Sequence, residues 1–195
     1  YDMEIASAQV KSCLLIAGIY SKGKTSITEP APSRDHTERM LKAFGYPITR
    51  DGVGGKITID GGGNLVGTKI DVPADISSAA FFMVAAAISH SSEIELRDVG
   101  INPTRTGILS LLNLMGVDIE ISNKREIGGE PIADITVRSS SIKAITVPKE
   151  LVPLAIDEFP VFCVAAACAE GTTVLRGAAE LRVKESDRIE SMAVG

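Results

Sequence analysis

The chain has 195 residues, of which 45% are hydrophobic and 23% are charged, and its formal net charge is −5. This length predicts one or two domains, and the composition excludes collagen, a coiled coil and wholesale disorder. The acidic balance, with 25 Asp and Glu against 20 Lys and Arg, argues against a general binder of nucleic acid or membrane surfaces.

Three segments begin with residues typical of a helix N-cap and continue with small apolar residues. They cover residues 7–18, 77–88 and 157–167. Each is apolar nearly all round, which predicts burial of the helix on every side. The three cysteines lie in such runs, so we expect small buried side chains in a reducing compartment. They are Cys13, Cys163 and Cys168.

A short alternating segment follows each helix, as in half-buried strands, at 24–28, 93–97 and 172–176. Amphipathic helices are predicted next, over 34–44, over 104–115 and from Lys184 onward, and the first two end at glycines. Further strands are predicted at 56–60, 117–121 and 134–137. The units begin at Ser7, Ser77 and Asp157, and this long spacing fits repeated α/β subdomains.

The glycines at 61–63 permit a chain reversal between the first two units, and we place a domain boundary there. No signal peptide opens the chain, and its apolar runs are too short to span a bilayer, so we expect a cytoplasmic protein. Both ends of the chain lie close to helical segments. We therefore expect it to be a piece of a longer protein.

One motif match is misleading. Gly18, Gly23, Lys24 and Thr25 have the spacing of a phosphate-binding loop, G-x-x-x-x-G-K-[ST]. Such a loop follows a strand and opens a helix, whereas here a helix precedes it and a strand follows. The two histidines are far apart and no Cys-x-x-Cys pattern occurs, so no metal site is indicated.

Residues 182–188 form the densest cluster of charge. If a helix begins near Lys184, then Lys184 and Arg188 share one face at a spacing of four residues. Two cations oppose the helix dipole there, and a bound anion would remove the conflict. The alternative is a solvated, charged helix start.

Other polar residues at helix starts also have two interpretations. Asp157 is either the N-cap of an apolar helix or a carboxylate general base. Ser7 and Gln9 are either capping residues or a phosphate-binding hydroxyl and amide.

Four segments closely resemble the 5-enolpyruvylshikimate-3-phosphate synthase family and keep its motif order: 7–12, 33–41, 75–79 and 181–188. The Ser-Ala-Gln and Ser-Arg-Asp-His forms are similar to the glyphosate-tolerant branch. The resemblance covers essentially the whole chain. It implies an α/β (α+β) fold of repeated βαβαββ units in two similar domains whose helix N-termini converge on a cleft. Residues 1–66 would be the last unit of one domain, and 67–195 the first part of the second.

The resemblance implies transfer of an enolpyruvyl group from phosphoenolpyruvate to the 5-hydroxyl of shikimate 3-phosphate, with release of phosphate, in chorismate and aromatic amino-acid biosynthesis. No cofactor or metal is implied. Ser7, Ala8, Gln9 and Arg34 would bind shikimate 3-phosphate. The partners would be these small molecules, not nucleic acid or membrane, and the full-length protein would be a monomer.

The same resemblance gives roles to residues near the end of the chain. Asp157 would bind substrate and accept the hydroxyl proton, and Glu185 would transfer a proton at the phosphoenolpyruvate methylene. Lys184 would lie between the two substrates, and Arg188 would clamp phosphoenolpyruvate. Much of the family's anion-binding set is missing, so we expect a central piece that is inactive alone.

Two alternatives stay open. The first is the UDP-N-acetylglucosamine enolpyruvyl transferase, which shares the fold but uses a loop cysteine. The second is a non-catalytic module that binds a phosphate ligand.

Overall fold

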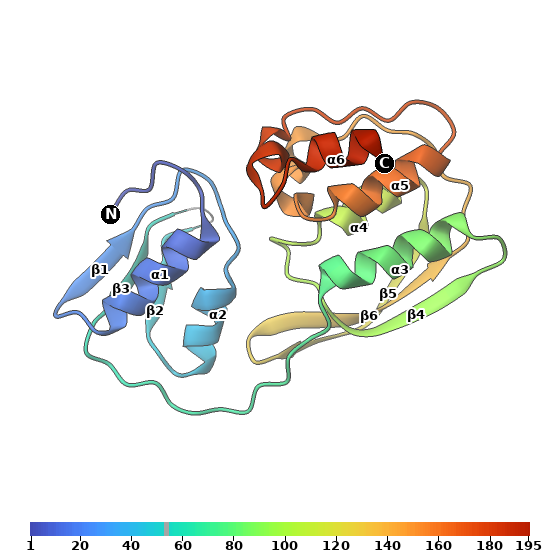
Figure 1. Cartoon of the computed structure of the whole chain (residues 1–195). Helices are drawn as coiled ribbons and strands as arrows, with labels where there is room; N and C mark the ends of the chain where they lie inside the picture. The colour runs from blue at the N-terminus through green and yellow to red at the C-terminus, as the bar shows by residue number, and fades with distance from the viewer. Residues whose placement is uncertain (53–54) are drawn as a thin grey trace. The chain divides into compact units, whose positions relative to one another are not determined.

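The computed structural model describes residues 1–52 and 55–195, which fall into two compact units. Unit 1 comprises Tyr1–Val72 with Glu126–Glu130, and unit 2 comprises Pro73–Arg125 with Pro131–Gly195. Among the described residues, each unit has a three-stranded sheet and its own buried apolar cluster. Helices and strands alternate along the chain (Figure 1), which confirms the predicted α/β class.

Unit 1 places helices against an antiparallel sheet (Figure 1). Its elements are α1 (Ala8–Ile19), β1 (Lys24–Ile27), α2 (His36–Ala43), β2 (Ile48–Arg50) and β3 (Ile57–Asp60). The central strand β3 pairs with β1 on one side and β2 on the other. The apolar core of the unit forms where α1 packs on β1 and β3, and includes Leu15, Ile27 and Ile57.

The order of elements at the start of unit 1 excludes a phosphate-binding loop. Gly18 lies inside α1, and Lys24 opens β1, so a helix precedes the glycines and a strand follows them. Ser7 is the N-cap of α1, as predicted, and its hydroxyl accepts a hydrogen bond from the backbone N–H of Val10 at 3.3 Å.

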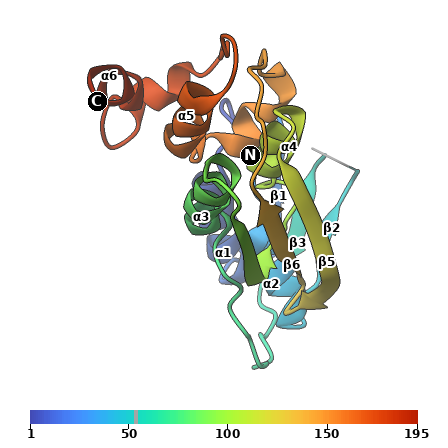
Figure 2. The same ribbon diagram turned by 90° about the vertical axis from the view of Figure 1, so that its right-hand side faces the viewer.

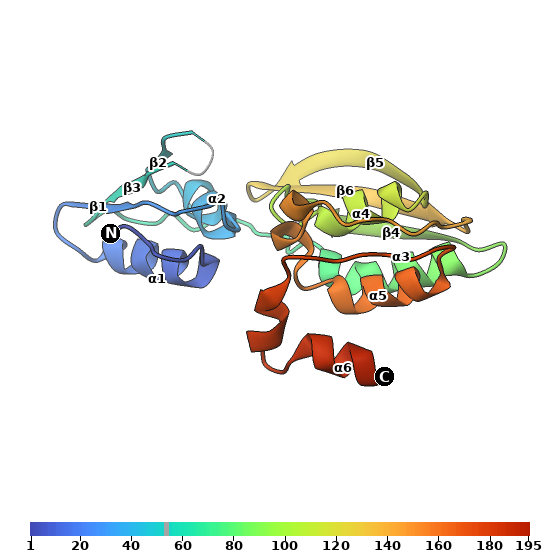
Figure 3. The ribbon, with the colours of Figure 1, turned by 90° about the horizontal axis from the view of Figure 1, so that it is seen from above.

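Unit 2 repeats the pattern on a larger scale, with helices against an antiparallel sheet of order β4-β6-β5. The first elements are α3 (Ile76–Ile88), β4 (Glu93–Gly100), α4 (Gly107–Leu114), β5 (Asp118–Ile127) and β6 (Glu130–Arg138). The later ones are the 3₁₀ helices η1 (Lys149–Leu151), η2 (Pro153–Ala155) and η3 (Ala179–Val183), with α5 (Phe159–Cys168) and α6 (Arg188–Val194). Helices α3 and α5 lie side by side (Figures 2 and 3).

Two predicted elements in unit 2 are wrong. The segment 172–176 is not a strand. Among the described residues, Val174 makes an isolated bridge to Thr146, without the continuous hydrogen-bonded ladder that a strand needs. No helix begins at Lys184, whose backbone is extended, and α6 begins at Arg188 behind the N-cap Asp187.

The predicted burial of the apolar helices is also wrong on one side of each helix. In α1, Val10 and Ile16 are 45% and 50% exposed. Cys13 and Cys168 are exposed and Cys163 is half-buried, and all three are free thiols. Periodicity cannot distinguish the two sides of a helix that is apolar all round. Within the part of the chain that the structure describes, no helix has the length and apolarity to cross a bilayer.

Asp75, rather than the predicted Ser77, is the N-cap of α3. Its carboxylate accepts from the backbone N–H of Ser78 at 2.9 Å and from the Ser78 hydroxyl at 3.0 Å. Burial acts to raise the pKa of Asp75, but these bonds and the charge of Arg105 outweigh it, so the pKa lies below the usual range.

We expect Asp75→Ala to lower the free energy of unfolding by about 1 kcal/mol at neutral pH, since it removes a helix cap. Asp75→Asn keeps the acceptor without the charge. Because the pKa is depressed in the folded state, the charge stabilises the fold above the unfolded pKa of about 3.9 and stops doing so as pH falls through the lower folded value. Urea denaturation at neutral and acid pH checks this, and an Asp-to-Asn difference that stays constant would contradict it.

Gly107 lets the start of α4 approach η2 closely. A Cβ at this position would lie 2.6 Å from the carbonyl carbon of Leu154 and 2.7 Å from the backbone nitrogen of Ala155. We expect Gly107→Ala to destabilise the protein by roughly 1–3 kcal/mol, because backbone must move to admit the methyl group. Thermal unfolding checks this against Gly67→Ala, where a Cβ meets open space.

Candidate functional site

The candidate residues fall into two groups, four in each unit. Ser7, Ala8, Gln9 and Arg34 lie in unit 1, at the start of α1 and in the loop before α2. The other four lie in unit 2, between η2 and the first residue of α6: Asp157, Lys184, Glu185 and Arg188.

The unit 1 group is built on the N-terminus of α1. Ser7 is half-buried and caps the helix through its oxygen, which leaves its O–H able to donate to a ligand. Ala8 and Gln9 are the first helical residues, whose backbone N–H groups have no acceptor within the helix. The positive end of the helix dipole and these N–H groups suit an anion such as phosphate.

Arg34 lies in the loop between β1 and α2 and is half-buried. The preceding residue fixes this loop on α1, because the carbonyl oxygen of Ser33 accepts a hydrogen bond from the Lys11 ammonium at 3.4 Å. Lys11 follows Ser7 by one helical turn, and its backbone N–H donates to the Ser7 carbonyl at 3.0 Å. The loop that carries Arg34 is therefore attached to the first turns of the helix that carries Ser7, Ala8 and Gln9.

In unit 2 two cations meet one carboxylate oxygen. Oδ1 of Asp157 lies 3.4 Å from Nη1 of Arg188 and 3.8 Å from Nζ of Lys184. All three side chains are about three-quarters buried, with 26%, 20% and 23% exposure respectively. Shielding from water strengthens such interactions relative to surface ion pairs.

Lys184 and Arg188 reach Asp157 by a different route from the predicted one. They do not share a helix face, because Lys184 lies in the extended segment between η3 and α6. The turn is held instead by the N-cap Asp187, whose carboxylate accepts from the backbone N–H of Glu190 at 3.0 Å and pairs with Arg182 at 2.8 Å.

Further carboxylates occupy the two cations in this unliganded structure. Lys184 pairs with Glu180 at 2.6 Å. The guanidinium of Arg188 donates to Glu185 through Nε at 3.0 Å and through Nη2 at 2.8 Å. An anionic ligand at this group would therefore compete with carboxylates that are already in place.

Asp157 is not the N-cap of α5, which is Glu158, and Glu158 makes no capping bond with its side chain. Glu158 is buried and instead accepts a short hydrogen bond from the hydroxyl of Ser77 on α3. Arg105 donates to the same hydroxyl at 2.7 Å. This cluster ties the residue after Asp157 to the first turn of α3.

The pKa of Glu185 lies below the usual range. The largest cause is a hydrogen bond from its own backbone N–H, followed by those from Arg188, and the charges of Arg188 and Lys184 act in the same direction. Glu185 is therefore an anion at neutral pH in this state.

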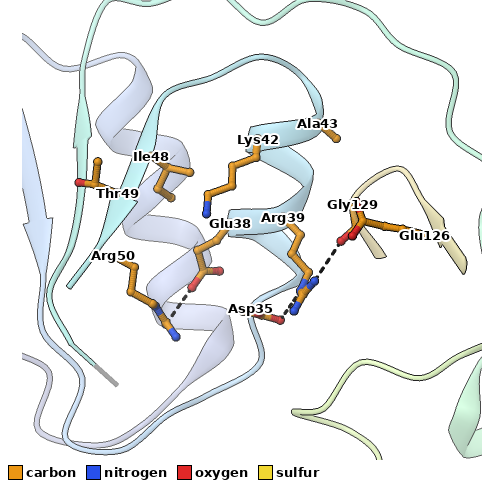
Figure 4. Close-up of a pocket in the computed structure, with 10 residues that line it drawn as sticks. All are labelled: Asp35, Glu38, Arg39, Lys42, Ala43, Ile48, Thr49, Arg50, Glu126 and Gly129. Atoms are coloured by element: carbon orange, nitrogen blue, oxygen red, sulfur yellow. Dashed lines mark hydrogen bonds and ion pairs between the residues drawn. The ribbon is translucent and has the colours of Figure 1, made fainter. Parts of the chain in front are cut away.

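Arg188 also borders an apolar pocket of about 520 Å³ in unit 2, between α5, α6 and the segment before η3. A second pocket, in unit 1, has about 440 Å³ and is lined by charged residues of α2 and β2, with Glu38 and Arg50 among them (Figure 4). Among the described residues, no group of three or more His, Cys, Asp or Glu side chains could hold a metal ion.

Sequence reasoning missed the buried ionic network of unit 1 and the Ser77–Glu158–Arg105 cluster. One signal was available for the first of these, since Lys11 is a cation in an otherwise apolar helix segment. The network comprises Lys11, Glu29, Glu38 and Arg50.

Comparisons with known proteins agree with one another. The sequence model of the EPSP synthase (3-phosphoshikimate 1-carboxyvinyltransferase) family matches residues 1–194. The 3-phosphoshikimate 1-carboxyvinyltransferases of Alkalilimnicola ehrlichii and Methylococcus capsulatus are 63% and 64% identical to all 195 residues. A solved structure of EPSP synthase from Acinetobacter baumannii is similar, with a TM-score of 0.94 at 61% identity over 100% of this chain. This chain spans only 43%, 44% and 44% of the length of these three relatives.

The contact between Arg188 and Glu185 predicts a measurable pKa change. We expect Arg188→Ala to raise the pKa of Glu185 but to leave it below the ordinary value, because the backbone N–H still donates to the carboxylate. Titration of the side-chain carboxyl carbon by NMR checks this. Arg182→Ala is the matched control, which should raise the pKa of Asp187 and leave that of Glu185 unchanged. No change at Glu185 in Arg188→Ala would contradict the assignment.

Proposed function

Because the chain belongs to the EPSP synthase family, we propose that the full-length protein transfers the enolpyruvyl group of phosphoenolpyruvate to the 5-hydroxyl of shikimate 3-phosphate and releases phosphate. The observation that carries the proposal is the meeting of Asp157, Lys184 and Arg188 at one carboxylate oxygen. It puts a proton acceptor next to cations that suit anionic substrates.

The reaction needs proton transfers and a phosphate leaving group. The 5-hydroxyl oxygen attacks C2 of phosphoenolpyruvate, its proton passes to Asp157, and C3 takes a proton from the protonated form of Glu185 to give a tetrahedral intermediate. The Glu185 carboxylate then takes a proton back from C3 while the bond from C2 to the phosphate oxygen breaks, which releases phosphate and restores the double bond. The charge of Lys184, 3.8 Å from Asp157, would stabilise negative charge that develops between the two substrates.

Glu185 would exchange the proton at C3, and its contact with Arg188 couples this role to substrate binding. In the unliganded state the pKa of Glu185 is lowered first by a backbone hydrogen bond and then by the hydrogen bonds from Arg188. A phosphate or carboxylate of phosphoenolpyruvate that took Arg188 would withdraw those hydrogen bonds and bring a negative charge near Glu185. Both changes raise the pKa of Glu185. Occupation of the site would thus make Glu185 easier to protonate.

Shikimate 3-phosphate would bind the unit 1 group. The hydroxyl of Ser7 and the backbone N–H groups of Ala8 and Gln9 would donate to its phosphate, with Gln9 able to add its side-chain amide. Arg34 would neutralise charge on the same substrate and can donate two parallel hydrogen bonds to an oxyanion.

The proposal takes the full-length protein as a cytoplasmic monomer that does not bind nucleic acid. The net charge of −5 over these 195 residues gives no sign of nucleic-acid binding in this part of the protein, because such binding draws on an excess of basic side chains. A sugar-nucleotide transferase is less well supported, because the family model that matches residues 1–194 is that of EPSP synthase and the three cysteines of this chain lie in α1 and α5.

Calorimetric titration of the full-length protein with shikimate 3-phosphate tests the proposal. We expect micromolar binding that weakens roughly 10- to 100-fold in Arg34→Ala and in Lys184→Ala, because each removes a charge-assisted hydrogen bond. Arg97→Ala is the control, since Arg97 is 73% exposed and pairs with Glu95 on β4. Absence of binding by the unaltered protein would leave a non-catalytic module as the better interpretation.

A second prediction separates the two substrates. We expect Arg188→Ala to weaken phosphoenolpyruvate roughly 10- to 100-fold and shikimate 3-phosphate much less, because Arg188 is assigned to the former. Arg182→Ala, in the same segment but paired with Asp187, should change neither affinity. Equal losses for both substrates in Arg188→Ala would contradict the assignment.

A further inference from the structure

Four charged side chains form a buried network in unit 1, one from each of four consecutive segments. Lys11 of α1 lies 3.3 Å from Glu29, which follows β1, and 2.9 Å from Glu38 of α2. Arg50 of β2 pairs with the same two oxygens at 2.6 and 3.1 Å, and Figure 4 shows its bond to Glu38. The side chains of Lys11 and Glu29 are 0% exposed.

The network balances two positive against two negative charges. An isolated charge in a protein interior is unfavourable, and a buried pair contributes little net stability over a well-packed apolar pair. Stability alone therefore gives no reason for a lysine at this position of an apolar helix. A better reason is that the network holds a neighbouring loop in place.

The network makes two hydrogen bonds with Ser33, the residue before Arg34. The Lys11 ammonium donates to the carbonyl oxygen of Ser33 at 3.4 Å, and the Ser33 hydroxyl donates to Oε2 of Glu29 at 2.5 Å. Glu29 and Ser33 both lie in the loop that leads from β1 to α2. Lys11 on α1 and Glu29 after β1 thus hold the backbone from which the Arg34 side chain extends.

We propose that Lys11 is a positioning residue: through Glu29 and Ser33 it sets the place of Arg34 relative to Ser7, Ala8 and Gln9, and so sets the affinity for shikimate 3-phosphate. This inference rests on the proposed function. Because the side chains of Lys11 and Glu29 are closed to solvent, neither touches the substrate. Their effect on binding passes through the loop.

The test compares three variants of the full-length protein by calorimetry with each substrate and by thermal unfolding. Lys11→Met removes the donor to Ser33 and leaves an unbalanced negative charge. Lys11→Met combined with Glu38→Gln restores the charge balance but not the donor. Leu15→Ala is the matched control, since Leu15 is buried one turn further along α1 and is not part of the network.

We expect Lys11→Met to lower the melting temperature and to weaken shikimate 3-phosphate about 10-fold, the loss of one interaction with a charged donor. The double variant should recover melting temperature while affinity stays low. Leu15→Ala should lower melting temperature with less than a twofold change in affinity, and phosphoenolpyruvate affinity should stay unchanged throughout.

The results of these measurements distinguish a positioning role of Lys11 from a merely structural one. If the double variant regains affinity together with melting temperature, or if Leu15→Ala weakens binding as much as Lys11→Met, the role is merely structural and the inference is overturned. The same holds if the unaltered protein binds the substrate and Lys11→Met binds it equally well. An unaltered protein that does not bind shikimate 3-phosphate overturns both the proposed function and the inference.

Discussion

Compensation of charge at the starts of apolar helices is the constraint on which both units depend. Helix α1 contains one charged side chain and α5 contains none, so charged groups at or near their starts find partners on other segments. Asp157, before α5, meets Lys184 and Arg188 from the segment around α6. Lys11, in the first turns of α1, meets carboxylates from two other segments. In each case the charge is held by a contact distant in sequence.

This constraint makes the unliganded site a set of exchangeable ion pairs. Arg188 is bound to Glu185 at 2.8 Å and lies 3.4 Å from Asp157. These carboxylates keep the cations in place without a ligand and limit their mutual repulsion. An anionic ligand that replaced Glu185 would exchange one charged partner for another, so little new desolvation would be needed at Arg188. Specificity for one anion over another would then depend on the positions of the cations and on the contacts that Glu185 makes after its release.

Local pattern was sufficient to predict much of the fold. Caps, apolar runs and terminal glycines located α1, α2 and α4 to within a few residues, because these signals lie within the element itself. The prediction of a strand at 172–176 was wrong because a strand needs a hydrogen-bonded partner strand, which local alternation of residues does not reveal. The predicted burial of Cys13 was wrong for a related reason, because a helix that is uniformly apolar does not indicate which of its sides faces the core.

The candidate site divides in the same way. The closeness of Asp157 and Lys184 follows from a resemblance between whole motifs, whereas the helix expected at Lys184 rested on charge spacing alone and is wrong. The network around Lys11 could not be predicted, although the lysine stands out among apolar neighbours, because its partners are 18 and 27 residues away. A lysine within an apolar helix indicates that a carboxylate partner is needed. The fold is required to identify that partner. Here the fold identifies a loop that is held through Ser33 and carries Arg34.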